Sequence, residues 1–149
     1  MIRTLTVGSD PREELKARLA HLQDVELPKL RSERGELGHL GTAALRDYAR
    51  REVQDVARLL AELQGELELV PDGTVRLNDC VVLQEQSEGE PEEFIVHAPG
   101  LIVKAPGFIS AETALGAAVL GKQAGDLVQV RTPRGSRDFV VQGVRRRSR

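Results

Sequence analysis

Residues 109–139 read ISAETALGAAVLGKQAGDLVQVRTPRGSRDF, and this stretch decides the fold of the second half of the chain. Small apolar residues from 114 to 120 predict a short helix that stops at Gly121, since glycine commonly follows the last helical residue. Alternating apolar and polar residues on both sides of Pro133–Gly135 predict two strands joined by a tight turn. A short helix packed on an antiparallel hairpin is therefore expected here.

The same two-residue alternation extends backwards from this stretch. It begins at Val75 and returns in residues 81–83 and 94–96, and the glutamate-rich segment between the last two runs favours an exposed hairpin loop. The turn residues Pro71–Gly73 mark a domain boundary. We expect residues 73–149 to form a globular domain made of an antiparallel sheet and a short helix.

The first half of the chain has a helical pattern instead. Asp10–Pro11 suits a helix start, and leucines follow at three- and four-residue spacing, with a kink or break expected at Pro28. A second apolar stripe, residues 45–67, repeats about every 3.5 residues, and the glycines between residues 35 and 41 predict a chain reversal. Residues 1–72 are expected to form an antiparallel helical hairpin with arms of ~35–40 Å. The predicted fold class is α+β.

Composition limits the classes of function. The 149 residues carry a net charge of −2 and only 3% aromatic side chains, which disfavours direct binding to nucleic acid. Cys80 is the single cysteine, so an intramolecular disulfide and a cysteine zinc site are excluded, and no cofactor is expected. With no signal-like start and no apolar run of ~20 residues, a cytoplasmic protein without membrane contact is predicted. A monomer is expected as well. The arginine-rich end, residues 145–149, is interpreted as a solvated terminus.

The pattern of the second half resembles a known family. The order Ile109-Ser110, Leu115-Gly116, Gly121-Lys122, Gly125-Asp126 and Thr132-Pro133 resembles the C-terminal domain of the Gre family of bacterial transcript-cleavage factors. The resemblance implies an N-terminal coiled-coil hairpin followed by an FKBP-like domain. It also implies that the globular domain docks on the rim of the RNA polymerase secondary channel while the coiled coil enters it. DNA and RNA would be reached only through the polymerase.

The resemblance also implies which residues contact the polymerase. By correspondence they are Ile109, Ser110, Glu112, Thr113, Ala114, Leu115 and Gly116. Ala114 stands where the family usually has proline. Leu115 is expected to be an apolar contact for the partner, although it equally suits the core of the domain.

At the hairpin tip the family carries two acidic residues, in a Gly-Asp-Leu-x-Glu-Asn-type motif, that help hold a second Mg²⁺ in the polymerase active site. The tip of this chain comprises Glu36, Leu37, Gly38, His39, Leu40, Gly41 and Thr42. Aligned from the first helix, Glu36 replaces the first acid and the second is missing. Aligned back from Tyr48, the two positions fall on Gly41 and Ala44. Asp47 is the next acid, and its spacing favours an ion pair with Arg50 or Arg51. Glu36 and Asp47 are the only candidates for a metal contact.

The sequence therefore predicts a factor, not itself an enzyme, that binds the polymerase at its secondary channel and modulates or inhibits transcription without stimulating cleavage. One alternative is a Gre-type elongation factor that still stimulates cleavage through Glu36 and a polymerase-held Mg²⁺. Another is an FKBP-like interaction module for a different partner. A prolyl isomerase is disfavoured because three Phe and one Tyr are too few to line an aromatic pocket.

Overall fold

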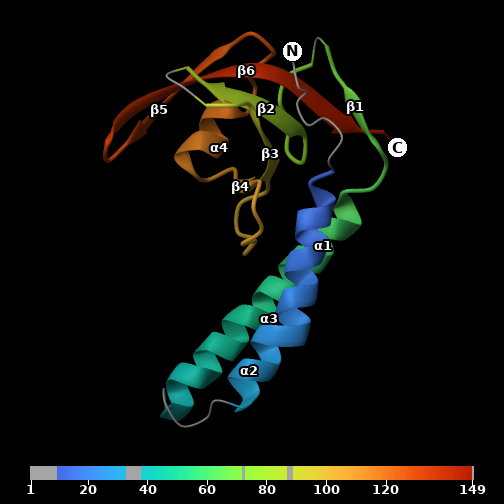
Figure 1. Ribbon diagram of the computed structural model, residues 1–149, viewed down its shortest axis with the longest axis vertical. Helices are drawn as coiled ribbons and strands as arrows, with labels where there is room; N and C mark the ends of the chain where they lie inside the picture. Colours follow the sequence, from blue (N-terminus) through green and yellow to red (C-terminus); the bar gives the residue numbers. More distant parts are fainter. Residues whose placement is uncertain (1–9, 33–37, 72, 87–88, 149) are drawn as a thin grey trace. The chain divides into compact units, whose positions relative to one another are not determined.

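The computed structural model describes residues 10–32, 38–71, 73–86 and 89–148 (Figure 1). The chain folds into two compact units. A helical unit comprises Arg12–Glu62 together with Leu101–Pro106, and a globular unit holds the rest. The division at 62/63 lies ten residues before the boundary expected at 72/73. The sequence also contained no sign that Leu101–Pro106 joins the helices.

The helical unit is the expected antiparallel hairpin. Its first arm consists of α1 (Arg12–His21), a π-helical turn η2 (Leu22–Glu26) and α2 (Leu27–Ser32), and its second arm is α3 (Gly38–Glu62). Both α1 and α2 pack along α3 (Figure 1). The 25 residues of α3 give it a length of about 37 Å.

The expected irregularity at Pro28 is confirmed, in the turn that precedes the proline. Pro28 has no N–H to donate to the carbonyl four residues earlier, and the turn widens so that the Leu27 N–H donates to the Leu22 carbonyl. A π turn shifts the phase of the following side chains. We attribute to this shift the half exposure of Val25, and of Leu45 and Tyr48 on α3, two residues expected in the buried stripe.

Both ends of α3 differ from expectation. The helix begins at Gly38, so residues 38–42, expected in the turn, form its first turns, whereas Glu36 and Leu37 lie outside the described residues. The helix ends at Glu62, and the last leucine of the stripe lies in β1 (Leu67–Leu69), which pairs with the end of β6. Strand pairing overrides leucine spacing there because tertiary hydrogen bonds outweigh local propensity.

The globular unit confirms the α+β class. Its remaining elements are β2 (Cys80–Glu85), β3 (Glu92–His97), β4 (Phe108–Ser110), α4 (Ala114–Val119), β5 (Leu127–Thr132) and β6 (Gly135–Arg147). The sheet order is β1-β6-β2-β3-β4, and β5 also pairs with β6. The sheet is mainly antiparallel, as expected, and the β3–β4 pair is its one parallel pair among the described strands. The alternation at Val75 corresponds only to an isolated bridge between Thr74 and Gln123.

The helix and hairpin predicted from residues 109–139 are confirmed. Gly121 follows α4 with φ +83°, and Gly135 ends the β5–β6 turn with φ +122°, values that glycine adopts without strain. The helix α4 lies on one face of the sheet (Figure 1), and its residues Leu115, Ala118 and Val119 belong to or pack against the core. The buried apolar core consists of Val75, Val81, Leu83, Val96, Val119, Val128, Val130, Val141 and Val144. None of the described helices has the length and apolar character needed to cross a bilayer.

Candidate protein-docking site

The connection from β4 to α4, residues 109–116, is held by hydrogen bonds of its own and is called the docking loop below. The Ser110 carbonyl accepts from the Thr113 N–H at 3.1 Å and from the Thr113 hydroxyl at 2.8 Å. Thr113 is the N-cap of α4, because its Oγ1 accepts from the Gly116 N–H at 3.0 Å. The Ser110 hydroxyl oxygen accepts from the Glu112 N–H at 3.2 Å. These bonds give the loop a defined shape.

Gly116 lets α4 start directly against β4. A Cβ at this position would lie 2.1 Å from the Ser110 carbonyl oxygen, a distance that no side chain tolerates. The glycine is therefore required by close packing, and its φ is not in the left-handed region.

The docking loop brings the predicted contact residues together, but they differ in exposure. Glu112, Thr113 and Ala114 are exposed, whereas Ile109 and Ser110 are half-buried and Gly116 is buried. Leu115 is half-buried and packs against the core. The exposed residues at the centre of the loop are therefore polar or have small side chains, and Leu115 lies at its edge.

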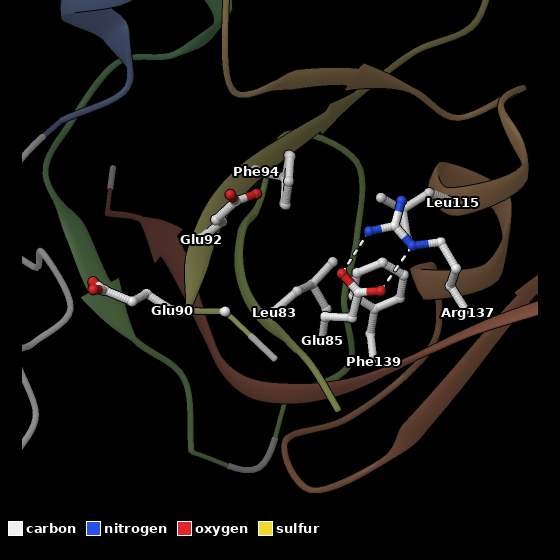
Figure 2. A pocket seen from close by; sticks show the side chains of 9 residues that line it. Leu83, Glu85, Glu90, Glu92, Phe94, Leu115, Arg137 and Phe139 are labelled. Atoms are coloured by element: carbon white, nitrogen blue, oxygen red, sulfur yellow. Dashed lines mark hydrogen bonds and ion pairs between the residues drawn. The ribbon is translucent and has the colours of Figure 1, made fainter. Parts of the chain in front are cut away.

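A cavity of about 240 Å³ lies beside the docking loop. Leu83, Phe94, Leu115 and Phe139 supply its apolar lining, and Figure 2 shows them around the same space. Two of the three phenylalanines in the chain meet here. Sequence reasoning missed this cavity because its walls come from β2, β3, α4 and β6. Its volume lies below the roughly 300–1,000 Å³ that is typical of small-molecule pockets.

Charged side chains surround this cavity. Arg137 Nε donates to Glu85 Oε2 at 2.8 Å, a second nitrogen donates to the other carboxylate oxygen, and the guanidinium lies 5.8 Å from the Phe139 ring centre (Figure 2). Glu90 and Glu92 also line the cavity and are exposed. The arginine is neutralised by Glu85, so the cavity has a net acidic rim.

Within the arginine-rich end, Arg145, Arg146 and Arg147 are not solvated, as the sequence had suggested, because they lie in β6 and pair with carboxylates. Arg145 pairs with Glu93 at 2.6 Å, Arg146 with Asp79 at 2.8 Å and Arg147 with Asp10 at 2.9 Å. The hydrogen bonds to Asp79 raise the pKa of Arg146. These charges are compensated inside the protein, so they do not form a basic surface for phosphate.

The remaining candidate residues do not form a metal site in the described part of the chain, where no three His, Cys, Asp or Glu side chains gather. Asp47 is 78% exposed, and the predicted ion pair is confirmed with Arg50, at 3.9 Å. Glu36 lies outside the described residues. Cys80 is fully buried in β2, and burial raises the pKa of its thiol to about 12, which confirms its interpretation as a small core residue.

Residues 70–146 match the family model described as transcription elongation factor, GreA/GreB, C-terminal. The chain is 31% identical to the transcription elongation factor GreA of Rhodospirillum rubrum over 148 residues, which cover 91% of this chain and 94% of that protein. It is 33% identical to GreA of Acholeplasma laidlawii over 133 residues, covering 80% and 82%.

Among solved structures, the crystal structure of GreA factor homolog 1 (Gfh1) of Thermus thermophilus covers 89% of this chain and 88% of its own, at 23% identity and a TM-score of 0.42. The protein belongs to the GreA/GreB family of transcription elongation factors.

Proposed function

We propose that the protein binds bacterial RNA polymerase at the secondary channel and modulates or inhibits transcription without stimulating transcript cleavage. The catalytic centre belongs to the polymerase, and this chain supplies a docking surface and a helical hairpin. A hairpin arm of about 37 Å would carry its tip into the channel. There it would obstruct nucleotide access or restrict movement of active-site elements.

The spacing of acids along α3 is the observation that carries this proposal. The helix begins at Gly38, and its first acid is Asp47, nine residues later. At ~1.5 Å per residue, Asp47 lies about 14 Å along the helix axis from the start. Between Gly35 and Asp47, Glu36 is the only acid. For two carboxylates to bind one Mg²⁺, an oxygen of each must lie about 2.0–2.1 Å from the ion. The separation of Glu36 and Asp47 along the chain does not favour this arrangement.

A transcript-cleavage assay on backtracked complexes tests the proposal. The protein should add little cleavage to that of the polymerase alone, while it changes the elongation rate or pausing in a matched run. A cleavage-competent GreA serves as the positive control. Strong stimulation by this protein would support the alternative mechanism through Glu36 and overturn the proposal.

A double variant tests the reason for the missing cleavage. Gly41→Asp with Ala44→Glu places two acids three residues apart on one face of α3, at the positions suggested by alignment from Tyr48. This variant should gain cleavage stimulation, and Gly41→Asn with Ala44→Gln is the uncharged control. Equal activity of the two variants would show that the acids are not the deciding feature.

Docking is tested at the exposed start of α4. Ala114→Glu places a bulky charge on the docking loop, and acids are well tolerated in the first turn of a helix. Polymerase affinity should fall at least tenfold. Ala117→Glu, on the same helix and also exposed, should bind like the wild type. Unchanged binding of Ala114→Glu would remove the docking loop from the interface.

A further inference from the structure

The helical unit carries an apolar hollow on its side, behind the tip. The described residues expose six large apolar side chains, and three of them, Val25, Leu45 and Tyr48, line this one hollow. Its volume is about 560 Å³, and Leu30 and Ala49 complete its apolar wall. We call it the α3 groove. It lies beside the π turn, which rotates the apolar side chains of the first arm relative to those of α3.

Lys104 lines one side of the groove and belongs to the strap, Leu101–Pro106, which two buried carboxylates of α3 hold in place. Glu52 is 1% exposed and accepts from the Lys104 N–H at 2.9 Å. Asp55 is 6% exposed and accepts from the Ile102 N–H at 2.9 Å. Buried carboxylates need such partners because desolvation is otherwise too costly. The backbone of the strap is thus fixed against α3.

This fixed backbone determines the rim of the groove. The Lys104 ammonium lies 4.5 Å from the centre of the Tyr48 ring, a cation–π contact on a ring that is 46% exposed. The tyrosine face and the lysine charge are therefore presented together. A half-exposed tyrosine loses little entropy on binding because it has only two side-chain torsions, and tyrosine is common among interface residues with large contributions.

The charges of the groove favour an acidic partner. Arg18 donates to Glu26 at 2.8 Å and, with two nitrogens, to Glu52 at 2.8 Å each, so it compensates one of the two carboxylate charges of the wall. Lys104 and Lys29 both line the groove and are exposed. The Glu52 oxygens are already occupied by partners within the protein and are not available to orient a small ligand. An apolar protein segment with a carboxylate opposite Lys104 matches this surface.

We propose that the α3 groove binds an apolar segment of RNA polymerase that carries an acidic residue opposite Lys104. This inference rests on the proposed function, in which the helical hairpin is the part of the protein that the polymerase encloses. It assigns the polymerase a second contact, made by different residues from those of the docking loop.

The test measures affinity of purified variants for the RNA polymerase of the same organism. Leu45→Gln and Tyr48→Gln should each weaken binding about 30-fold, the loss typical of a central interface residue. Glutamine has nearly the helix propensity of leucine, so α3 should be retained, and circular dichroism checks this. Leu127→Gln is the matched control: this leucine is 60% exposed on β5, and its loss should leave affinity unchanged.

Charge is tested separately at the rim. Lys104→Glu should weaken binding more than Lys104→Ala, since it places a like charge opposite the acidic residue of the partner. Equal affinities of the two Lys104 variants would overturn the acidic-partner part of the inference.

The outcomes separate this inference from the proposed function. If the wild type binds and both groove variants bind within twofold of it, the groove inference fails and the proposed function stands. A loss of equal size in Leu127→Gln would also overturn it, because the effect would not be specific to the groove. If the wild type dimerises and Leu45→Gln abolishes the dimer without affecting polymerase binding, a second copy occupies the groove and the inference is wrong. If the wild type does not bind the polymerase at all, both fail.

Discussion

Glu52→Gln tests whether the carboxylate in the middle of α3 holds the helical unit together. In the wild type, Glu52 accepts two hydrogen bonds from Arg18 at 2.8 Å and one from the Lys104 N–H at 2.9 Å. Burial raises the pKa of Glu52, but the hydrogen bonds and charges of Arg18 and Lys104 outweigh it, so that its pKa lies below the ordinary value. The ionised form is therefore the stable form in the folded protein.

The expected loss follows from these contacts. Removing one partner of a buried ion pair typically costs roughly 3–5 kcal/mol. Here the amide of glutamine can still accept one hydrogen bond, and Glu26 still pairs with Arg18 at 2.8 Å. We therefore expect the free energy of unfolding to fall by about 2–3 kcal/mol, below the full cost of an unpaired buried charge.

Urea unfolding followed by far-ultraviolet circular dichroism measures this loss, because the signal comes mainly from the helical arms. Glu62→Gln is the matched control on the same helix, where Glu62 is 46% exposed and lies 3.8 Å from Arg58. An exposed pair of this spacing contributes about 0.3–0.5 kcal/mol. The reasoning is refuted if the two variants lose the same free energy of unfolding, since burial would then make no difference.

Three further predictions follow from single contacts. Because the pKa of folded Glu52 lies below its ordinary value of 4.5, its contribution to stability is present above about pH 4.5 and is lost as the pH falls through the folded-state pKa; urea midpoints measured from neutral to acidic pH should therefore decline less steeply in Glu52→Gln than in the wild type. Gly116→Ala should lower the free energy of unfolding by roughly 1–3 kcal/mol because the new methyl group meets the Ser110 carbonyl oxygen, whereas Ala117→Ser should stay within about 0.5 kcal/mol; equal urea midpoints would contradict the close approach. Cys80, whose pKa burial raises to about 12, should resist a thiol reagent at mildly alkaline pH in the native protein and react fully in urea; rapid native labelling would show that β2 opens.

Much of the globular domain could be predicted because its signals are local. The Pro133-Arg134-Gly135 turn predicted the β5–β6 hairpin, and the small residues before Gly121 predicted α4. Turn residues and two-residue alternation act over a few positions, so they can be recognised without knowledge of the rest of the chain. The parallel β3–β4 pair could not be found this way, since pairing partners across a long connection leave no local pattern.

The candidate sites divide in the same way. The docking loop stays a prediction from residues adjacent in sequence, and only the structure distinguished exposed Ala114 from half-buried Leu115. The cavity beside Phe94 and Phe139 joins residues 45 positions apart, and the strap meets α3 through Glu52 and Lys104, 52 positions apart. Nothing in the spacing of those residues indicates that they touch.

By itself, the sequence determined the helical hairpin, the α+β domain, the family and the shortage of acids at the tip. These follow from periodicity, turn residues and residue identity, which are all local properties of the chain. Only the tertiary structure decided that Arg145, Arg146 and Arg147 pair with carboxylates, that Leu45 and Tyr48 leave the buried seam, and that Lys104 of the strap lines a groove. Those features depend on which distant groups meet after folding, where desolvation and hydrogen bonding select partners that no local pattern specifies.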